Sequence, residues 1–179
     1  RNFEYYSEDP FVTGKIGTAM TLGIQSQGVG VSAKHYAVNS QESDRTRVDE
    51  RVSQRALREL YLRGFERVLR ESDPWTVMSA YNLVNGEFAQ GSKGLLTDIL
   101  RTDWGFRGIV MTDWWAVGCE EGSEPSTRLV ASMVRAQNDL FMVMNDSEAN
   151  TGNDDSAESL RLGKVTRAEY QRSAMNICR

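Results

Sequence analysis

Four short apolar runs divide the chain into repeating units. They occupy residues 29–33 (VGVSA), 76–80 (TVMSA), 108–112 (GIVMT) and 140–144 (LFMVM). Each run has few polar side chains and does not alternate cleanly, which is typical of strands in a parallel sheet that is covered on both faces. Their separations of about 30 to 50 residues leave room for a crossover helix between successive strands. We therefore predict an α/β fold made of strand–helix units.

Helical patterns fill the intervals between the apolar runs. Residues 10–26 place apolar side chains at steps of four, and Asp9 and Pro10 supply the signals of a helix N-terminus. The stretch 48–72 has the strongest helical pattern, with Arg and Glu opposite an apolar side. The apolar faces comprise Val12, Ile16, Met20 and Ile24 in the first helix, and Val52, Leu57, Leu60, Tyr61 and Phe65 in the second.

Further helices are predicted at 92–105, 126–137, 156–162 and 166–178. Gly105 closes the first of them, and Thr166 begins the last with Glu169 at the spacing of a capping box. The polar stretch 145–156 (NDSEANTGNDDS) reads as a loop.

Polar side chains stand at the end of every predicted strand. No G-x-G-x-x-G or P-loop pattern follows any run, so the usual signature of a nucleotide-binding sheet is missing. In a β/α barrel the ends of all strands share one face, where catalytic sites are built. The strand ends carry the pairs Lys34-His35, Tyr81-Asn82, Asp113-Trp114 and Asn145-Asp146. Four different polar pairs in this position predict a functional site.

The number of strands predicts only part of a barrel. A complete (β/α)8 barrel of the TIM type takes about 250 residues and eight strands, whereas this chain has 179 residues and four predicted strands. We predict that residues 1–179 form a partial barrel domain, the later portion, and that the first strands and a second domain lie outside this chain. Such a portion would expose open sheet edges, so we expect it to need the remainder of the barrel, in the same or another chain.

Composition narrows the classes of partner. The formal charge of −4 argues against a nucleic-acid-binding surface, and no apolar stretch approaches the length of a membrane span. The start, RNFEYYSEDP, does not resemble a signal peptide, which leaves a cytoplasmic and a secreted location both open. Cys119 and Cys178 fit neither a disulfide framework nor a metal spacing, and His35 is the single histidine. No metal or organic cofactor is implied.

Asp113 raises two competing hypotheses. It directly follows a buried run and precedes two tryptophans, in GIVMTDWWA. It could be a turn-forming residue that caps the end of a strand. It could also be a carboxylate that performs chemistry beside an aromatic platform. Trp114 would then be part of that platform.

Four stretches together resemble glycoside hydrolase family 3, the β-glucosidase-type enzymes. They are RNFEYYSEDP, KHYAVNSQESDRTRVDERVSQRALRELYLRGF, PWTVMSAYNLVNG and WGFRGIVMTDWWA, and the resemblance covers most of residues 1–143. It implies a retaining hydrolase that cleaves β-linked sugars through a covalent glycosyl-aspartate, with a small saccharide or glycoside as substrate. The nucleophile would be Asp113, in the motif Met111-Thr112-Asp113-Trp114. Retaining hydrolysis requires such an ionised carboxylate and a second carboxyl that protonates the leaving oxygen.

The resemblance also implies substrate-binding residues. Lys34 and His35 match a pair that binds sugar hydroxyls where cleavage occurs, although on their own they could be a surface lysine and a packed histidine. Arg45 matches a sugar-binding arginine after N-x-Q-E, and spacing favours it over Arg47. The remaining matches are Arg1, which opens an R-x-x-E-x-x-S-E-D pattern, and Tyr81 in S-A-Y-N, whose alternative role is a core aromatic.

The chain departs from the family pattern in two places. Val143-Met144 replaces the usual Pro-Gly after Asp139-Leu140-Phe141-Met142. The acid/base carboxylate normally comes from a second domain, and the loop acids Glu120, Glu121 and Glu124 are not evident candidates. A non-catalytic carbohydrate-binding or scaffold half-barrel is therefore the alternative, and a half-barrel that dimerises could accompany either function. The KHYAVNSQE form weakly favours a glucosidase or xylosidase over an N-acetylglucosaminidase.

Overall fold

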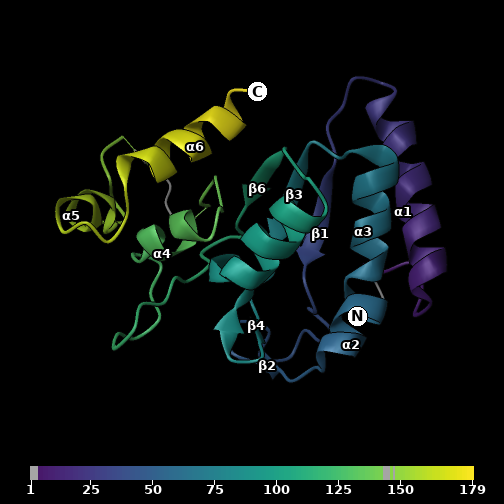
Figure 1. Ribbon diagram of the computed structural model, residues 1–179, viewed down its shortest axis with the longest axis horizontal. Helices are drawn as coiled ribbons and strands as arrows, with labels where there is room; N and C mark the ends of the chain where they lie inside the picture. Colours follow the sequence, from purple (N-terminus) through teal and green to yellow (C-terminus); the bar gives the residue numbers. More distant parts are fainter. Residues whose placement is uncertain (1–3, 143–145, 147) are drawn as a thin grey trace.

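The computed structural model describes residues 4–142, 146 and 148–179, and has an α/β architecture (Figure 1). Its main sheet contains three parallel strands in the order of the chain, β1 (Ser32–Tyr36), β3 (Thr76–Ser79) and β6 (Ile109–Met111). The register of the sheet is given by Thr76 of β3, which lies opposite Ser32 of β1 on one side and Ile109 of β6 on the other. The predicted parallel arrangement of these three strands is confirmed.

Two of the predicted strands differ from those observed. The first begins at Ser32 rather than at residue 29, since its pairing with β3 starts at Ser32 opposite Thr76. Just before it, Gly30 lies so close to Trp75 that a Cβ there would be 2.3 Å from the indole. Lys34 and His35 are consequently inside β1 and not after it. The fourth run, 140–144, is reduced to an isolated parallel bridge between Leu140 and Met111. Residues 143 and 144 lie outside the described part of the chain.

Helix α1 (Pro10–Gln25) begins where predicted, and the Asp9 carboxylate caps it by accepting from the backbone N–H groups of Phe11 and Val12. The face that packs within the described structure is not the apolar face identified from the sequence. Its buried residues are small, namely Gly14, Gly17, Thr18 and Thr21, whereas the four predicted apolar residues are exposed. Small side chains allow α1 to lie close against α3 (Arg63–Ser72), as Figure 1 shows.

The long helix predicted at 48–72 is shorter and interrupted. Residues 49–50 form strand β2 (Asp49–Glu50), and the helix begins as α2 (Gln54–Ala56) behind the cap Ser53. It continues as a π-helical turn, η1 (Leu57–Tyr61), and then as α3. Leu57 and Phe65 of the predicted face are buried, Val52 is half-buried, and Leu60 and Tyr61 are exposed.

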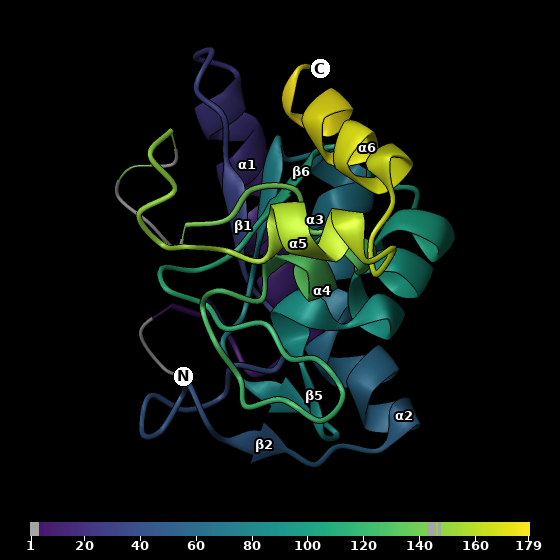
Figure 2. The ribbon, with the colours of Figure 1, turned by 90° about the vertical axis from the view of Figure 1, so that its left-hand side faces the viewer.

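A second small sheet was not predicted. Strand β2 pairs in parallel with β4 (Leu83–Val84), which forms a hairpin with β5 (Glu87–Phe88). Asn85 and Gly86 connect the hairpin, and both have positive φ angles, as a tight two-residue turn requires. Figure 2 shows this sheet at the end of the molecule opposite the C-terminus of α6.

All but one of the remaining helices lie close to predicted positions. They are η2 (Ala89–Gly91), the π-helical η3 (Gly94–Asp103), α4 (Val130–Arg135), α5 (Ser156–Arg161) and α6 (Arg167–Ile177). Of these, η2 was not predicted, and α4 is shorter at both ends than the predicted stretch 126–137. In the part of the chain that the structure describes, no helix is both long and apolar enough to cross a membrane.

The core consists of two clusters. The larger one lies around the main sheet and includes Tyr36, Val77, Leu96 and Val110. The smaller one joins α4 to the segment before α6 through Met133, Val134 and Val165. The larger cluster also contains Phe65 of α3 and Ile99 of η3, so the helices that precede and follow β3 in the chain both pack against the main sheet.

The capping box of α6 provides a direct test of the fold. The Thr166 hydroxyl accepts from the Glu169 N–H, and the Glu169 carboxylate accepts from the Thr166 N–H at 2.7 Å. We expect Thr166→Ala to destabilise α6 by about 1 kcal/mol, measurable as several-fold faster hydrogen exchange of the α6 amides. Glu169→Gln should cost less because it keeps a hydrogen-bonding group. Unchanged exchange in Thr166→Ala would contradict the expectation.

Candidate active site

Asp113 lies at the carboxyl end of β6 and is 7% exposed. Thr112 precedes it and donates its N–H to the carbonyl of Leu140, which ties this strand end to the neighbouring segment. The Asp113 Oδ1 atom accepts from the backbone N–H of Trp114 at 2.8 Å. This local bond is the one expected of a turn-forming aspartate. The second carboxylate oxygen, Oδ2, faces the imidazole of His35.

His35 connects Asp113 to the first strand. Its Nε2 atom lies 3.4 Å from Asp113 Oδ2, and its Nδ1 atom lies 3.2 Å from Glu4 Oε2. The Nζ atom of Lys34 lies 3.3 Å from His35 Nε2 and 3.2 Å from Glu4 Oε1. The structure thus brings the predicted Lys34, His35 and Asp113 into one cluster. It adds Glu4, which sequence reasoning did not assign to the site.

Tyr81 and Arg45 reach the same region. Tyr81 follows β3, is buried, and donates its hydroxyl to the carbonyl oxygen of Trp114 at 2.7 Å. The guanidinium carbon of Arg45 lies 4.9 Å from the centre of the Tyr81 ring, a cation–π contact. Burial, together with the Asp113 carboxylate, raises the pKa of Tyr81 to about 12. Tyr81 therefore stays a neutral hydrogen-bond donor through the physiological pH range, in contact with the predicted site.

Two neighbouring indoles are open to solvent. Trp114 is 51% exposed and Trp115 is 63% exposed, although both follow a buried strand end. The backbone N–H of Trp115 donates to the carbonyl oxygen of Met142 at 2.8 Å, and the φ angle of Trp115 is 55°. The backbone is thus anchored while the aromatic side chains remain accessible. An exposed indole beside a carboxylate suits stacking on the apolar face of a sugar.

Other predicted groups lie elsewhere. Arg1 is outside the described residues. Glu120 forms a two-bond ion pair with Arg135 of α4, at 2.8 and 2.9 Å, and Glu121 and Glu124 are exposed. Within residues 4–142, 146 and 148–179, no group of three or more His, Cys, Asp or Glu side chains is arranged to hold a metal ion.

Comparisons with known proteins identify the class to which the chain belongs. The chain belongs to glycosyl hydrolase family 3, because all of residues 1–179 match the model of its N terminal domain. It is 50% identical over 177 residues to a β-glucosidase of Ruminococcus albus, covering 99% of this chain and 18% of that protein. It is 53% identical over 116 residues to an exo-α-(1→6)-L-arabinopyranosidase of Bifidobacterium breve, covering 65% of this chain and 15% of that protein.

Solved structures show the same likeness. A β-glucosidase from Paenibacillus barengoltzii matches with a TM-score of 0.95 and 50% identity, over 99% of this chain and 20% of that one. β-Glucosidase 3B from Thermotoga neapolitana in complex with glucose matches with a TM-score of 0.86 and 42% identity, over 98% of this chain and 24% of that one. The chain therefore spans about a fifth of the length of these relatives.

Proposed function

We propose that this chain is part of a retaining β-glycosidase of the β-glucosidase type, and that Asp113 is its nucleophile. The observation that carries the proposal is the cluster of Asp113 with His35 and Lys34, in which a buried carboxylate lies beside two basic side chains. Basic and hydrogen-bonding side chains are the neighbours that a nucleophilic carboxylate needs. The β-glucosidases among the relatives support the same reaction class.

The reaction takes two displacements at the anomeric carbon. An Asp113 oxygen bonds to C1 while the bond from C1 to the leaving oxygen breaks and that oxygen takes a proton from an acidic carboxyl group. Water then attacks C1, gives its proton to the same carboxylate, and the bond to Asp113 breaks. The sugar hydroxyls would bind Lys34, His35 and Arg45, and the Trp114 indole would cover an apolar sugar face. A segment outside this chain would supply the carboxyl.

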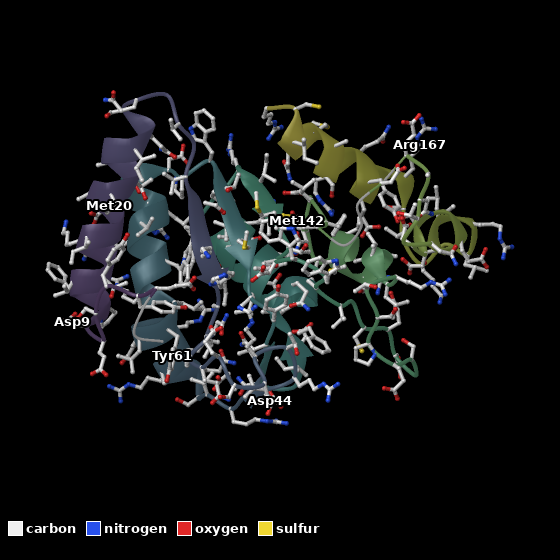
Figure 3. The ribbon with its side chains drawn as sticks, turned by 180° about the vertical axis from the view of Figure 1, so that it is seen from behind. Asp9, Met20, Asp44, Tyr61, Met142 and Arg167 are labelled. Carbon is white, nitrogen blue, oxygen red and sulfur yellow. The ribbon has the colours of Figure 1, made fainter. Side chains whose placement is uncertain are left out.

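We also propose that the chain is the later part of a (β/α)8 barrel domain, completed by strands and a second domain elsewhere in the polypeptide. β1 is at the edge of its sheet. A groove of about 850 Å³ runs beside it, between α1, η1 and α3. Met20 and Tyr61, labelled in Figure 3, line this groove and are exposed. Further strands added at this edge would cover both residues.

A non-catalytic sugar-binding scaffold is the second candidate. Glu120 is the loop carboxylate nearest in sequence to Asp113. Its ion pair with Arg135 favours the scaffold, because that carboxylate is already engaged. An activated aryl β-glucoside distinguishes the two candidates, because its good leaving group needs little help from an acid. We expect the full-length polypeptide to release the aryl alcohol and to carry a sugar on Asp113, detected by mass spectrometry. Sugar binding without release or labelling would favour the scaffold.

A further inference from the structure

Glu4 contacts both basic residues of the candidate site. It lies in the segment before α1, about 30 residues from its partners, and is partly buried. One carboxylate oxygen accepts from Lys34 Nζ, and the other lies 3.2 Å from His35 Nδ1. Tyr5, the next residue, donates its hydroxyl to the carbonyl of His35 at 3.5 Å. The N-terminal segment therefore holds both the side chain and the backbone at His35.

Glu4 is one of two carboxylates that flank the His35 ring. A neutral imidazole has one N–H donor, whereas the imidazolium form has a donor on each nitrogen. Here both ring nitrogens face carboxylate oxygens, of Glu4 on one side and Asp113 on the other. Lys34 Nζ lies 3.3 Å from Nε2. Glu4 accepts from Lys34 and faces Nδ1, so one carboxylate contacts both basic side chains of the site.

We propose that Glu4 is a positioning residue, which fixes the side chains of Lys34 and His35 beside Asp113 without touching the sugar itself. The inference rests on the proposed function, in which Lys34 and His35 bind sugar hydroxyls. The titratable groups that face the imidazole include Glu4, Lys34 and Asp113. Glu4 is a shared partner of Lys34 and His35, and its loss removes a contact that holds both side chains beside Asp113.

The test is a double-mutant cycle in the full-length polypeptide. We expect Glu4→Gln to lower kcat/KM for an aryl β-glucoside by about tenfold to a hundredfold, the range that misplacement of a supporting group produces. Because Glu4 acts through His35, the double variant Glu4→Gln/His35→Ala should be little worse than His35→Ala alone. A role confined to holding the N-terminal segment would give additive losses. Glu4→Asp keeps the charge and should recover part of the activity.

Glu8→Gln is the matched control, since Glu8 lies in the same segment and is exposed. It should leave kcat/KM within about twofold of the parent, inside the usual range for surface substitutions. Activity of Glu4→Gln equal to that control, or additive losses in the cycle, would overturn the inference.

Glucose affinity, measured by calorimetry, separates the inference from the proposed function. If the polypeptide has no hydrolase activity but Glu4→Gln still weakens glucose binding non-additively with His35→Ala, the positioning role stands and the proposed reaction is wrong. If hydrolysis requires Asp113 but Glu4→Gln leaves it unchanged, the proposed reaction stands and the positioning role is wrong.

Discussion

Replacing Asp113 with Asn should abolish turnover in the full-length polypeptide while sugar binding persists. The amide is nearly isosteric and can still accept the Trp114 N–H, but it cannot form the glycosyl ester with C1. Loss of a residue that forms the covalent bond costs roughly a thousandfold or more in kcat. The measurements are kcat with an aryl β-glucoside and glucose affinity by calorimetry.

Asp103→Asn is the matched control for this variant. Asp103 is an aspartate at the end of η3 whose carboxylate pairs with Arg58 on the surface. Its replacement should leave kcat close to that of the parent. If Asp113→Asn keeps full activity, the nucleophile has been assigned to the wrong residue.

The largest loss of stability is expected at Asp139. Its side chain is fully buried and forms an ion pair with Arg101, which is also buried. Its oxygens accept further hydrogen bonds from the Val110 N–H at 2.9 Å and from Asn176 Nδ2 at 3.0 Å. Asp139 therefore joins β6, η3 and α6. Asp139→Asn leaves the guanidinium of Arg101 buried without a counter-charge, which costs about 3–5 kcal/mol.

Denaturant unfolding of the full-length polypeptide, with limited proteolysis to locate the change, measures this effect. Asp103→Asn again serves as the control, because an exposed ion pair contributes about 1 kcal/mol or less. The double variant Arg101→Met/Asp139→Leu should be more stable than Asp139→Asn, since it removes both buried charges together. Equal stability of Asp139→Asn and Asp103→Asn would show that the buried pair has no special role.

Local sequence signals predicted the features that depend on neighbouring residues. Asp9 before Pro10 located the start of α1, and Thr166 with Glu169 located the start of α6, because capping bonds span only three or four residues. The hairpin of the second sheet was missed, although Asn85-Gly86 is a recognised signal for a two-residue turn. The strands of this hairpin are only two residues long, which is too short to show an alternation of apolar and polar residues.

The helix α1 packs through a face that its sequence pattern did not identify. The apolar residues at steps of four are exposed, and the glycines on another face pack against α3. A Cβ on Gly17 would lie 2.8 Å from Val68 Cγ2, so only the smallest residue fits this contact. The periodic pattern identified an apolar face and could not say which neighbour that face would meet.

The sequence by itself determined the three parallel strands, the presence of helices between them, and the family. These follow from short-range periodicity and from motifs that are contiguous in the chain. Only the tertiary structure decided that Glu4 and Asp113 lie on opposite sides of the His35 ring, and that Tyr81 bonds to the carbonyl of Trp114. Contacts between residues 30 or more positions apart depend on strand register and helix packing, which no local pattern specifies.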